Sequence, residues 1–144
     1  MRAILRVLCV LALVSGSSAA FSQQYFTNTG VMRVVKYRIL PGKSADFFKW
    51  LSNAPKILGA EQQAGLIESF HFIHSTEFVG PDKWDVAIVI TYKNMAALDE
   101  IGPKSDPIVA KAWGSPEARA AATKLASESM EVVSAELVRN IELK

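Results

Sequence analysis

A sharp break between a strand pattern and a helix pattern stands near the start of this chain. The run Val31–Leu40 is rich in β-branched and aromatic residues, and Pro41-Gly42 stops it at once. Behind the break, Ser44 is a favourable N-cap, and apolar residues recur at helical spacing from Phe47 to Leu51. A strand that passes directly into a helix is the start of a βα unit, which constrains how the rest of the chain folds.

Periodicity and turn residues predict the elements that follow. The helical spacing continues to Ala64, Pro55 kinks or splits that helix, and Gly65 closes it. Gly102-Pro103 is predicted to end a later, short helix, and an irregular segment at 104–114 follows it. The pattern predicts strands at 66–75, 84–92 and 132–143, the short helix at 94–101 and a longer helix at 115–130.

The element order β-α-β-β-α-β predicts a single α+β domain over 31–144, with the ferredoxin-like βαββαβ fold. Its four-stranded antiparallel sheet has the helices on one face. The other face would carry either Phe70, Phe72 and His74, or His71 and Ile73. Because neither set suits exposure to water, we expect a homodimer in which a second sheet covers this face.

The first 20 residues have the layout of a secretory signal peptide. Arg2 and Arg6 are basic, Val7–Val14 is an uncharged apolar run, and small residues continue to Ala20. The apolar run is shorter than the ~20 residues that a membrane-spanning helix needs. We therefore expect cleavage after Ala20, export to the periplasm or the extracellular medium, no membrane attachment afterwards, and a loose arm at 21–30.

Cleavage would remove the single cysteine, Cys9, together with the net charge of +2 that Arg2 and Arg6 supply. The mature chain would then have no disulfide and no thiolate nucleophile or ligand. Its balanced charge argues against a nucleic-acid surface, which needs a basic excess. The chain has no glycine-rich phosphate loop, no nucleophile elbow and no dinucleotide fingerprint, so no cofactor is predicted.

The run Tyr37–Lys43, followed by Phe47 and Phe48, resembles the opening of the dimeric α/β-barrel superfamily, and Tyr92–Leu98 resembles its later step from strand to helix. Antibiotic-biosynthesis monooxygenases and the EthD and NIPSNAP groups belong to this superfamily. The resemblance implies sheet-to-sheet dimers with a ligand cavity between each sheet and its helices. It also implies a small apolar or aromatic ligand, or cofactor-independent oxygenation, cyclisation or isomerisation of an aromatic or enolic compound.

The two histidines, His71 and His74, lie in one predicted strand. Because they are three residues apart, they point to opposite faces and cannot share a metal ion, so no metal site is predicted. Either histidine can act as a general base near neutral pH, and we assign that role to His71. A hydrogen-bonded structural histidine is the alternative for both, and an axial haem ligand is a third interpretation.

The predicted substrate-binding residues are Tyr37, Trp50, Tyr92, Asp106 and Trp113. The two tyrosines offer hydroxyl groups that could orient a phenolic or enolic substrate, although the pattern favours packing for them and for Trp50. Trp113 follows the irregular segment and could form a lid, with Asp106 as a polar group beside it. Since no paired acid and base are evident, a non-catalytic binding or interaction module remains the alternative function.

Overall fold

The computed structural model describes residues 25–77 and 79–144. The expected signal peptide at 1–20 lies outside the described residues, as does the beginning of the expected arm. The chain divides into two compact units, one of Gly30–Val138 and one that joins the residues up to Thr29 with Arg139–Lys144. The larger unit carries all the described helices and the candidate site.

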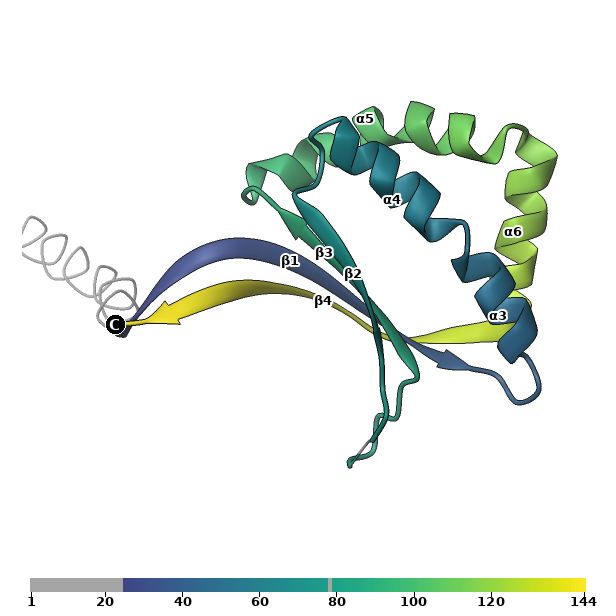
Figure 1. Ribbon diagram of the computed structural model, residues 1–144, viewed down its shortest axis with the longest axis horizontal. Coiled ribbons are helices and arrows are strands. Elements are labelled where there is room, and N and C mark those ends of the chain that lie inside the picture. The colour runs from purple at the N-terminus through teal and green to yellow at the C-terminus, as the bar shows by residue number, and fades with distance from the viewer. Residues whose placement is uncertain (1–24, 78) are drawn as a thin grey trace, which may run out of the picture. The chain divides into compact units, whose positions relative to one another are not determined.

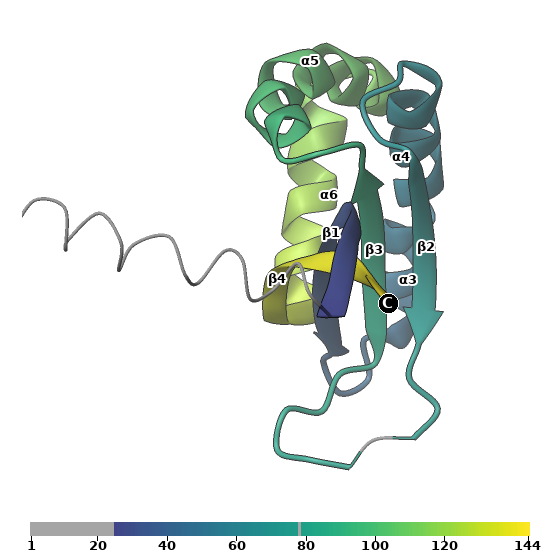
Figure 2. The ribbon, with the colours of Figure 1, turned by 90° about the vertical axis from the view of Figure 1, so that its left-hand side faces the viewer.

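The fold is ferredoxin-like, as the sequence predicts. In chain order the elements are β1 (Phe26–Ile39), α3 (Ser44–Leu51), α4 (Ala54–Gln63), β2 (Ser69–His74), β3 (Val86–Tyr92), α5 (Ala96–Trp113), α6 (Pro116–Ser129) and β4 (Met130–Leu143) (Figure 1). The strands form one sheet in the order β2-β3-β1-β4, in which β3 pairs antiparallel with β1 and with β2. Figure 2 shows β2 at the edge beside β3, and within the larger unit the helices lie on one side of the sheet.

The strand register decides which residues share each face of the sheet. Residues directly opposite each other in an antiparallel pair point to the same face. Phe70 lies opposite Ile90, and both pack against the core on the helix side. Phe72 and His74 follow Phe70 at intervals of two residues, and they therefore share the helix side. His71 and Ile73 lie on the helix-free face, which settles the alternative that the sequence leaves open.

The hydrophobic core is small and lies between the sheet and the helices α3, α4 and the beginning of α5. Its central cluster comprises Leu58, Ile67, Ile88 and Tyr92. Phe47 is fully buried beside it, on α3. Among the described residues only eight apolar and two polar side chains are buried, which is few for a chain of 144 residues. A core of this size leaves much apolar surface for a partner to cover.

Two boundaries near the first βα unit differ from the prediction. β1 begins at Phe26 rather than Val31, because its early residues are hydrogen-bonded in the sheet with β4. Ser44 is wrong as the N-cap: Lys43 occupies that position and makes no side-chain cap. Ser44 is already helical, and the Lys43 ammonium instead pairs with the carboxylate of Asp46 at 3.2 Å. The predicted split at Pro55 is confirmed by the separate helices α3 and α4.

The predicted stop at Gly102-Pro103 and the irregular segment 104–114 are wrong. α5 runs through Pro103 and Pro107 and ends only at Gly114, whose φ of +76° suits a glycine. Each proline removes one backbone N–H, and thereby deprives the carbonyl four residues earlier of its partner. These carbonyls belong to Asp99 and Pro103, which are exposed residues, so water can replace the missing partners and the helix continues.

None of the helices in the described part of the chain is both long enough and apolar enough to cross a membrane.

Candidate functional site

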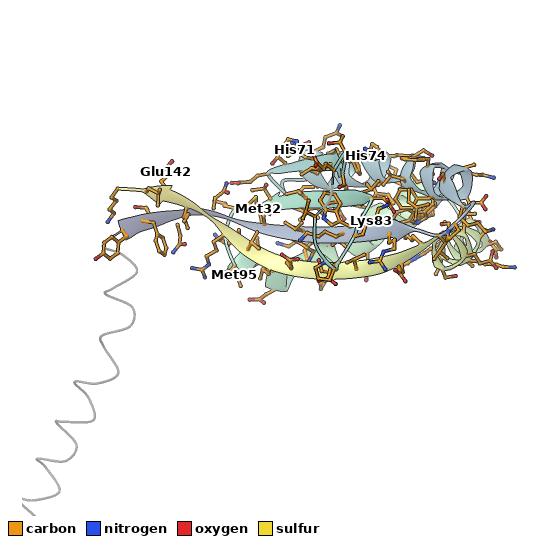
Figure 3. All side chains as sticks on the ribbon, turned by 90° about the horizontal axis from the view of Figure 1, so that it is seen from below. Met32, His71, His74, Lys83, Met95 and Glu142 are labelled. Atoms are coloured by element: carbon orange, nitrogen blue, oxygen red, sulfur yellow. The ribbon has the colours of Figure 1, made fainter. Side chains whose placement is uncertain are left out.

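The two histidines lie on β2, at the edge of the sheet away from β4 (Figure 3). Both side chains are exposed. His71 is on the helix-free face and His74 on the helix side, so the strand keeps them apart. Within 25–77 and 79–144, no group of three or more histidine, cysteine, aspartate or glutamate side chains is arranged to hold a metal ion. The role of His71 as a base stays a prediction.

Tyr37 and Trp50 come together in an aromatic cluster between β1 and α3. Their ring centroids are 5.7 Å apart, with the planes at 65°. The ring of Phe47 lies 6.3 Å from Tyr37 and 5.9 Å from Trp50. Burial raises the pKa of the Tyr37 hydroxyl above its ordinary value of 10.0, so this hydroxyl is protonated at neutral pH. The three rings fill space between sheet and helix.

Tyr92 is the most chemically informative residue of the core. It ends β3 and is only 2% exposed. Burial raises the pKa of its hydroxyl, the positive charge of Arg33 lowers it, and the negative charge of Glu61 raises it. The net direction is upward, so Tyr92 is protonated at neutral pH and can donate a hydrogen bond. Its hydroxyl is thus within electrostatic reach of one carboxylate and one guanidinium.

Glu61 is a carboxylate inside the protein. It lies on α4 and is 6% exposed. The hydroxyl of Ser105, on α5, donates a hydrogen bond to Glu61 Oε1. Burying a carboxylate is costly unless hydrogen bonds or opposite charges compensate it, and one serine hydroxyl is a modest compensation. Such a group needs an explanation beyond packing.

Arg33 supplies the opposite charge from the sheet. It pairs in register with Ile90 on β3. Because Ile90 packs against the core, Arg33 belongs to the helix side of β1, between Val31 and Val35. We call Arg33, Glu61, Tyr92 and Ser105 the Tyr92 cluster. Chemically it combines a buried proton acceptor, a hydroxyl donor and an exposed cation, which is a set that can bind a weak acid and stabilise its anion.

A crevice of about 300 Å³ lies next to the Tyr92 cluster. It is lined by Gly65, Leu66, Ile67, Glu68, Lys93, Asn94, Ala96, Ala97 and Glu100. Leu66 and Ala97 also pack against the core cluster that contains Tyr92. The backbone N–H of Leu66 donates to the carbonyl of Glu61 at 3.0 Å. The crevice therefore leads from the surface to the residues that adjoin the Tyr92 cluster.

Asp106 and Trp113 do not line this crevice. Asp106 is exposed on α5, directly after Ser105. Trp113 lines a separate hollow of about 280 Å³ at the turn between α5 and α6, together with Arg119. The structure therefore brings together Tyr37 and Trp50 in one cluster and places Tyr92 in a second, whereas Asp106 and Trp113 lie elsewhere on α5.

A third hollow, of about 290 Å³, lies on the helix-free side beside the connection from β2 to β3. Its walls include Trp84 and the ion pair between Lys36 and Glu136, whose charged atoms are 2.8 Å apart. Hydrogen bonds from Lys36 and Ser134 lower the pKa of the Glu136 carboxyl. Because this carboxylate is already paired and its side chain is exposed, its charge is explained without a ligand.

Sequence reasoning missed Glu61, Arg33 and Ser105. A signal existed for the first two. Glu61 follows Leu58 by three residues, on the stripe of α4 that faces the core. Arg33 lies two residues from both Val31 and Val35, which are apolar, and therefore shares their face of the strand. A charged residue at an inward-facing position marks a candidate site. Ser105 gave no signal, because its segment was predicted to be irregular.

No protein-family model and no curated protein matches the chain. Among solved structures, a DABB family protein with a ferredoxin-like fold from Mesorhizobium loti is 14% identical, with a TM-score of 0.46 over 80% of this chain and 99% of that one. A dimeric protein of unknown function and ferredoxin-like fold from Bacteroides fragilis is 14% identical, with a TM-score of 0.43 over 81% and 98%. HapK from Hahella chejuensis is 17% identical, with a TM-score of 0.45 over 76% and 91%. The similar structures thus include dimeric ferredoxin-like proteins.

Proposed function

We propose that this chain is an exported, homodimeric small-molecule-binding protein whose ligand site is centred on the Tyr92 cluster. The observation that carries the proposal is the buried carboxylate of Glu61 near the buried Tyr92, with the exposed Arg33 on the same side of the sheet. An apolar side chain at the position of Glu61 would stabilise the core more simply. A carboxylate that is kept buried beside a tyrosine with a raised pKa, next to a crevice, is typical of a functional site.

The cluster suits an aromatic or enolic compound with an acidic proton. Glu61 would accept that proton from the ligand on a carboxylate oxygen, and the ligand would keep the electron pair as a phenolate or enolate. The neutral Tyr92 hydroxyl would donate a hydrogen bond to the resulting oxyanion, and Arg33 would balance its charge. Proton removal of this kind is the first step of an isomerisation or cyclisation, and the same contacts also serve a non-catalytic binder.

The homodimer is supported by the helix-free face of the sheet. Val34 and Val89 lie opposite each other at its centre, and Ile73 extends the apolar surface on β2 with 46% of its side chain exposed. The core of one chain is small, so a second copy that covers this face would add the missing apolar burial. The export part of the proposal depends on the pattern of residues 1–20, and mass spectrometry of the protein from its own cell would test it by finding cleavage after Ala20.

The ligand proposal is tested with 4-nitrophenol, a small aromatic acid whose anion absorbs visible light. Titration into the full chain is expected to give a saturable change in absorbance. Glu61→Gln and Tyr92→Phe should each weaken binding by about tenfold or more, since each removes a hydrogen bond to a charged or acidic group.

The matched control is Glu77→Gln, which makes the same chemical change at an exposed position outside the crevice. This variant should bind 4-nitrophenol as the parent does. Absence of saturable binding, or equal binding by the Glu61 and Glu77 variants, would contradict the proposed site.

A further inference from the structure

Helix α5 is weakly attached to the rest of the fold. It has 18 residues, yet none of them is buried. It contacts α4 and α6, and only near its start do partly buried side chains, those of Ala97, Leu98 and Ile101, pack against the core cluster. A helix gains most of its stability by burying an apolar face, so a helix without buried residues opens more easily than its neighbours.

The middle of α5 is also its weakest part internally. Gly102 and Pro103 stand together there, and Pro107 follows four residues later. The two prolines remove two consecutive hydrogen bonds of one helix face, and the glycine adds backbone freedom. Both prolines are exposed, so no packing on their side chains offsets this loss.

The hydrogen bond that links α5 to the Tyr92 cluster lies in this weak stretch. Ser105 stands between Pro103 and Pro107, and its hydroxyl donates to the buried carboxylate of Glu61. The crevice beside the cluster is lined on one side by the beginning of α5, at Ala96, Ala97 and Glu100. Opening of the middle of α5 would release Glu61 and widen the crevice toward Tyr92 in a single movement.

We propose that the segment Gly102–Pro107 of α5 is a gate: it opens locally while the rest of the fold stays intact, and it closes again through the hydrogen bond from Ser105 to Glu61. Its purpose, admission of a ligand to the Tyr92 cluster, rests on the proposed function. The opening itself does not depend on a ligand.

Amide hydrogen exchange of the full chain, followed by mass spectrometry, tests the gate. Amides between Lys104 and Ala110 are expected to exchange at least about tenfold faster than those of Leu58 and Glu61 on α4, and to do so at a rate that low urea concentrations leave unchanged. Exchange on α5 that equals exchange on α4, with the urea dependence of global unfolding, would overturn the proposal.

A pair of proline variants makes the test specific. The double variant Pro103→Ala/Pro107→Ala restores both backbone donors and should slow exchange in α5 by about tenfold or more. The matched control is Pro116→Ala, since Pro116 is at the first position of α6, where the missing donor costs nothing. It should leave α5 unchanged. Equal exchange in the double variant and the parent also counts against the gate.

Stopped-flow mixing with 4-nitrophenol separates the gate from the ligand site. The double proline variant should slow the association of 4-nitrophenol, whereas Glu61→Gln should weaken its equilibrium binding. If 4-nitrophenol does not bind at all, the proposed function fails, and the exchange data still decide whether α5 opens. If binding is normal but its rate is unaffected by the proline substitutions, the gate is wrong and the site stands.

Discussion

Tyr37 and Trp50 meet edge to face between β1 and α3, with ring centroids 5.7 Å apart. The geometry is favourable for two aromatic rings, and the fully buried ring of Phe47 lies against both. Both residues pack in the first βα unit, which is the interpretation that the sequence pattern favours, and their contacts with a ligand stay a prediction. The polar atoms available for chemistry lie further along the sheet, around Tyr92.

The half-buried Tyr37 and the buried Tyr92 predict that the protein loses stability at alkaline pH. The folded-state pKa values of Tyr37 and Tyr92 are raised above 10.0, chiefly by burial. The folded protein therefore holds these protons more tightly than the unfolded chain, and the resulting stabilisation is lost as the pH rises above 10.0. Urea unfolding at a series of pH values should show the free energy of unfolding falling in this range. The double variant Tyr37→Phe/Tyr92→Phe should show a shallower fall, and an identical slope would contradict this explanation.

The neighbouring residues Phe47 and Phe48 on α3 should lose very different amounts of unfolding free energy when each is replaced by alanine. Phe47 is fully buried, whereas Phe48 is 48% exposed. Phe47→Ala should lower the free energy of unfolding by about 3 to 5 kcal/mol, because it leaves a cavity among the aromatic rings. Phe48→Ala is the matched control and should cost about 1 kcal/mol or less. Chemical denaturation measures both, and similar losses would mean that the packing described for α3 is wrong.

The fold could be predicted from the sequence because its signals are local. The break at Pro41-Gly42 and the glycine at Gly65 each end an element for a stereochemical reason that neighbours in space do not change. Asn94 likewise marks the start of α5: it precedes the N-cap residue Met95, and its side chain accepts a hydrogen bond from the N–H of Ala97 at 3.0 Å. The order of these elements then leaves few topologies.

The course of α5 could not be predicted in the same way. Two prolines in a helix pattern normally end it, and only their exposure lets α5 continue through Pro103 and Pro107. Exposure is a tertiary property. The Tyr92 cluster was missed for a similar reason, since Glu61 meets Ser105 only when α4 and α5 lie side by side. The buried position of Glu61 could have been read from its place on the stripe of Leu58.

Replacement of Glu61 by an apolar residue of similar volume is expected to raise the stability of the protein or leave it unchanged. Its carboxylate is buried with Ser105 as its hydrogen-bond partner, so Glu61→Met removes a desolvation cost and adds apolar contact. The free energy of unfolding should stay within about 1 kcal/mol of the parent or rise. Leu58→Ala, on the same stripe, should instead cost about 2 to 5 kcal/mol. A large loss in the methionine variant would identify Glu61 as a structural group.

Removal of the N-cap of α6 is expected to cause a moderate loss of stability. The side chain of Ser115 accepts a hydrogen bond from the N–H of Ala118 at 3.1 Å. Ser115→Ala should therefore reduce the free energy of unfolding by about 1 kcal/mol, which a shift of the urea midpoint would measure. Ser127→Ala is the control, because Ser127 is an exposed serine within the same helix and should change stability by only a few tenths of a kcal/mol.

The helix-free face of the sheet predicts how the homodimer can be disrupted. Val34 and Val89 lie directly opposite each other on this face, and each is only partly buried within one chain. In the proposed dimer both would be fully covered, so Val34→Lys or Val89→Lys would bury an unpaired charge. Light scattering at micromolar concentration should therefore give a dimer for the parent and a monomer for both variants. Ala45→Lys, at an exposed position on α3, is the control and should remain dimeric. A monomeric parent would rule out the dimer, and dimeric lysine variants would move the interface to another surface.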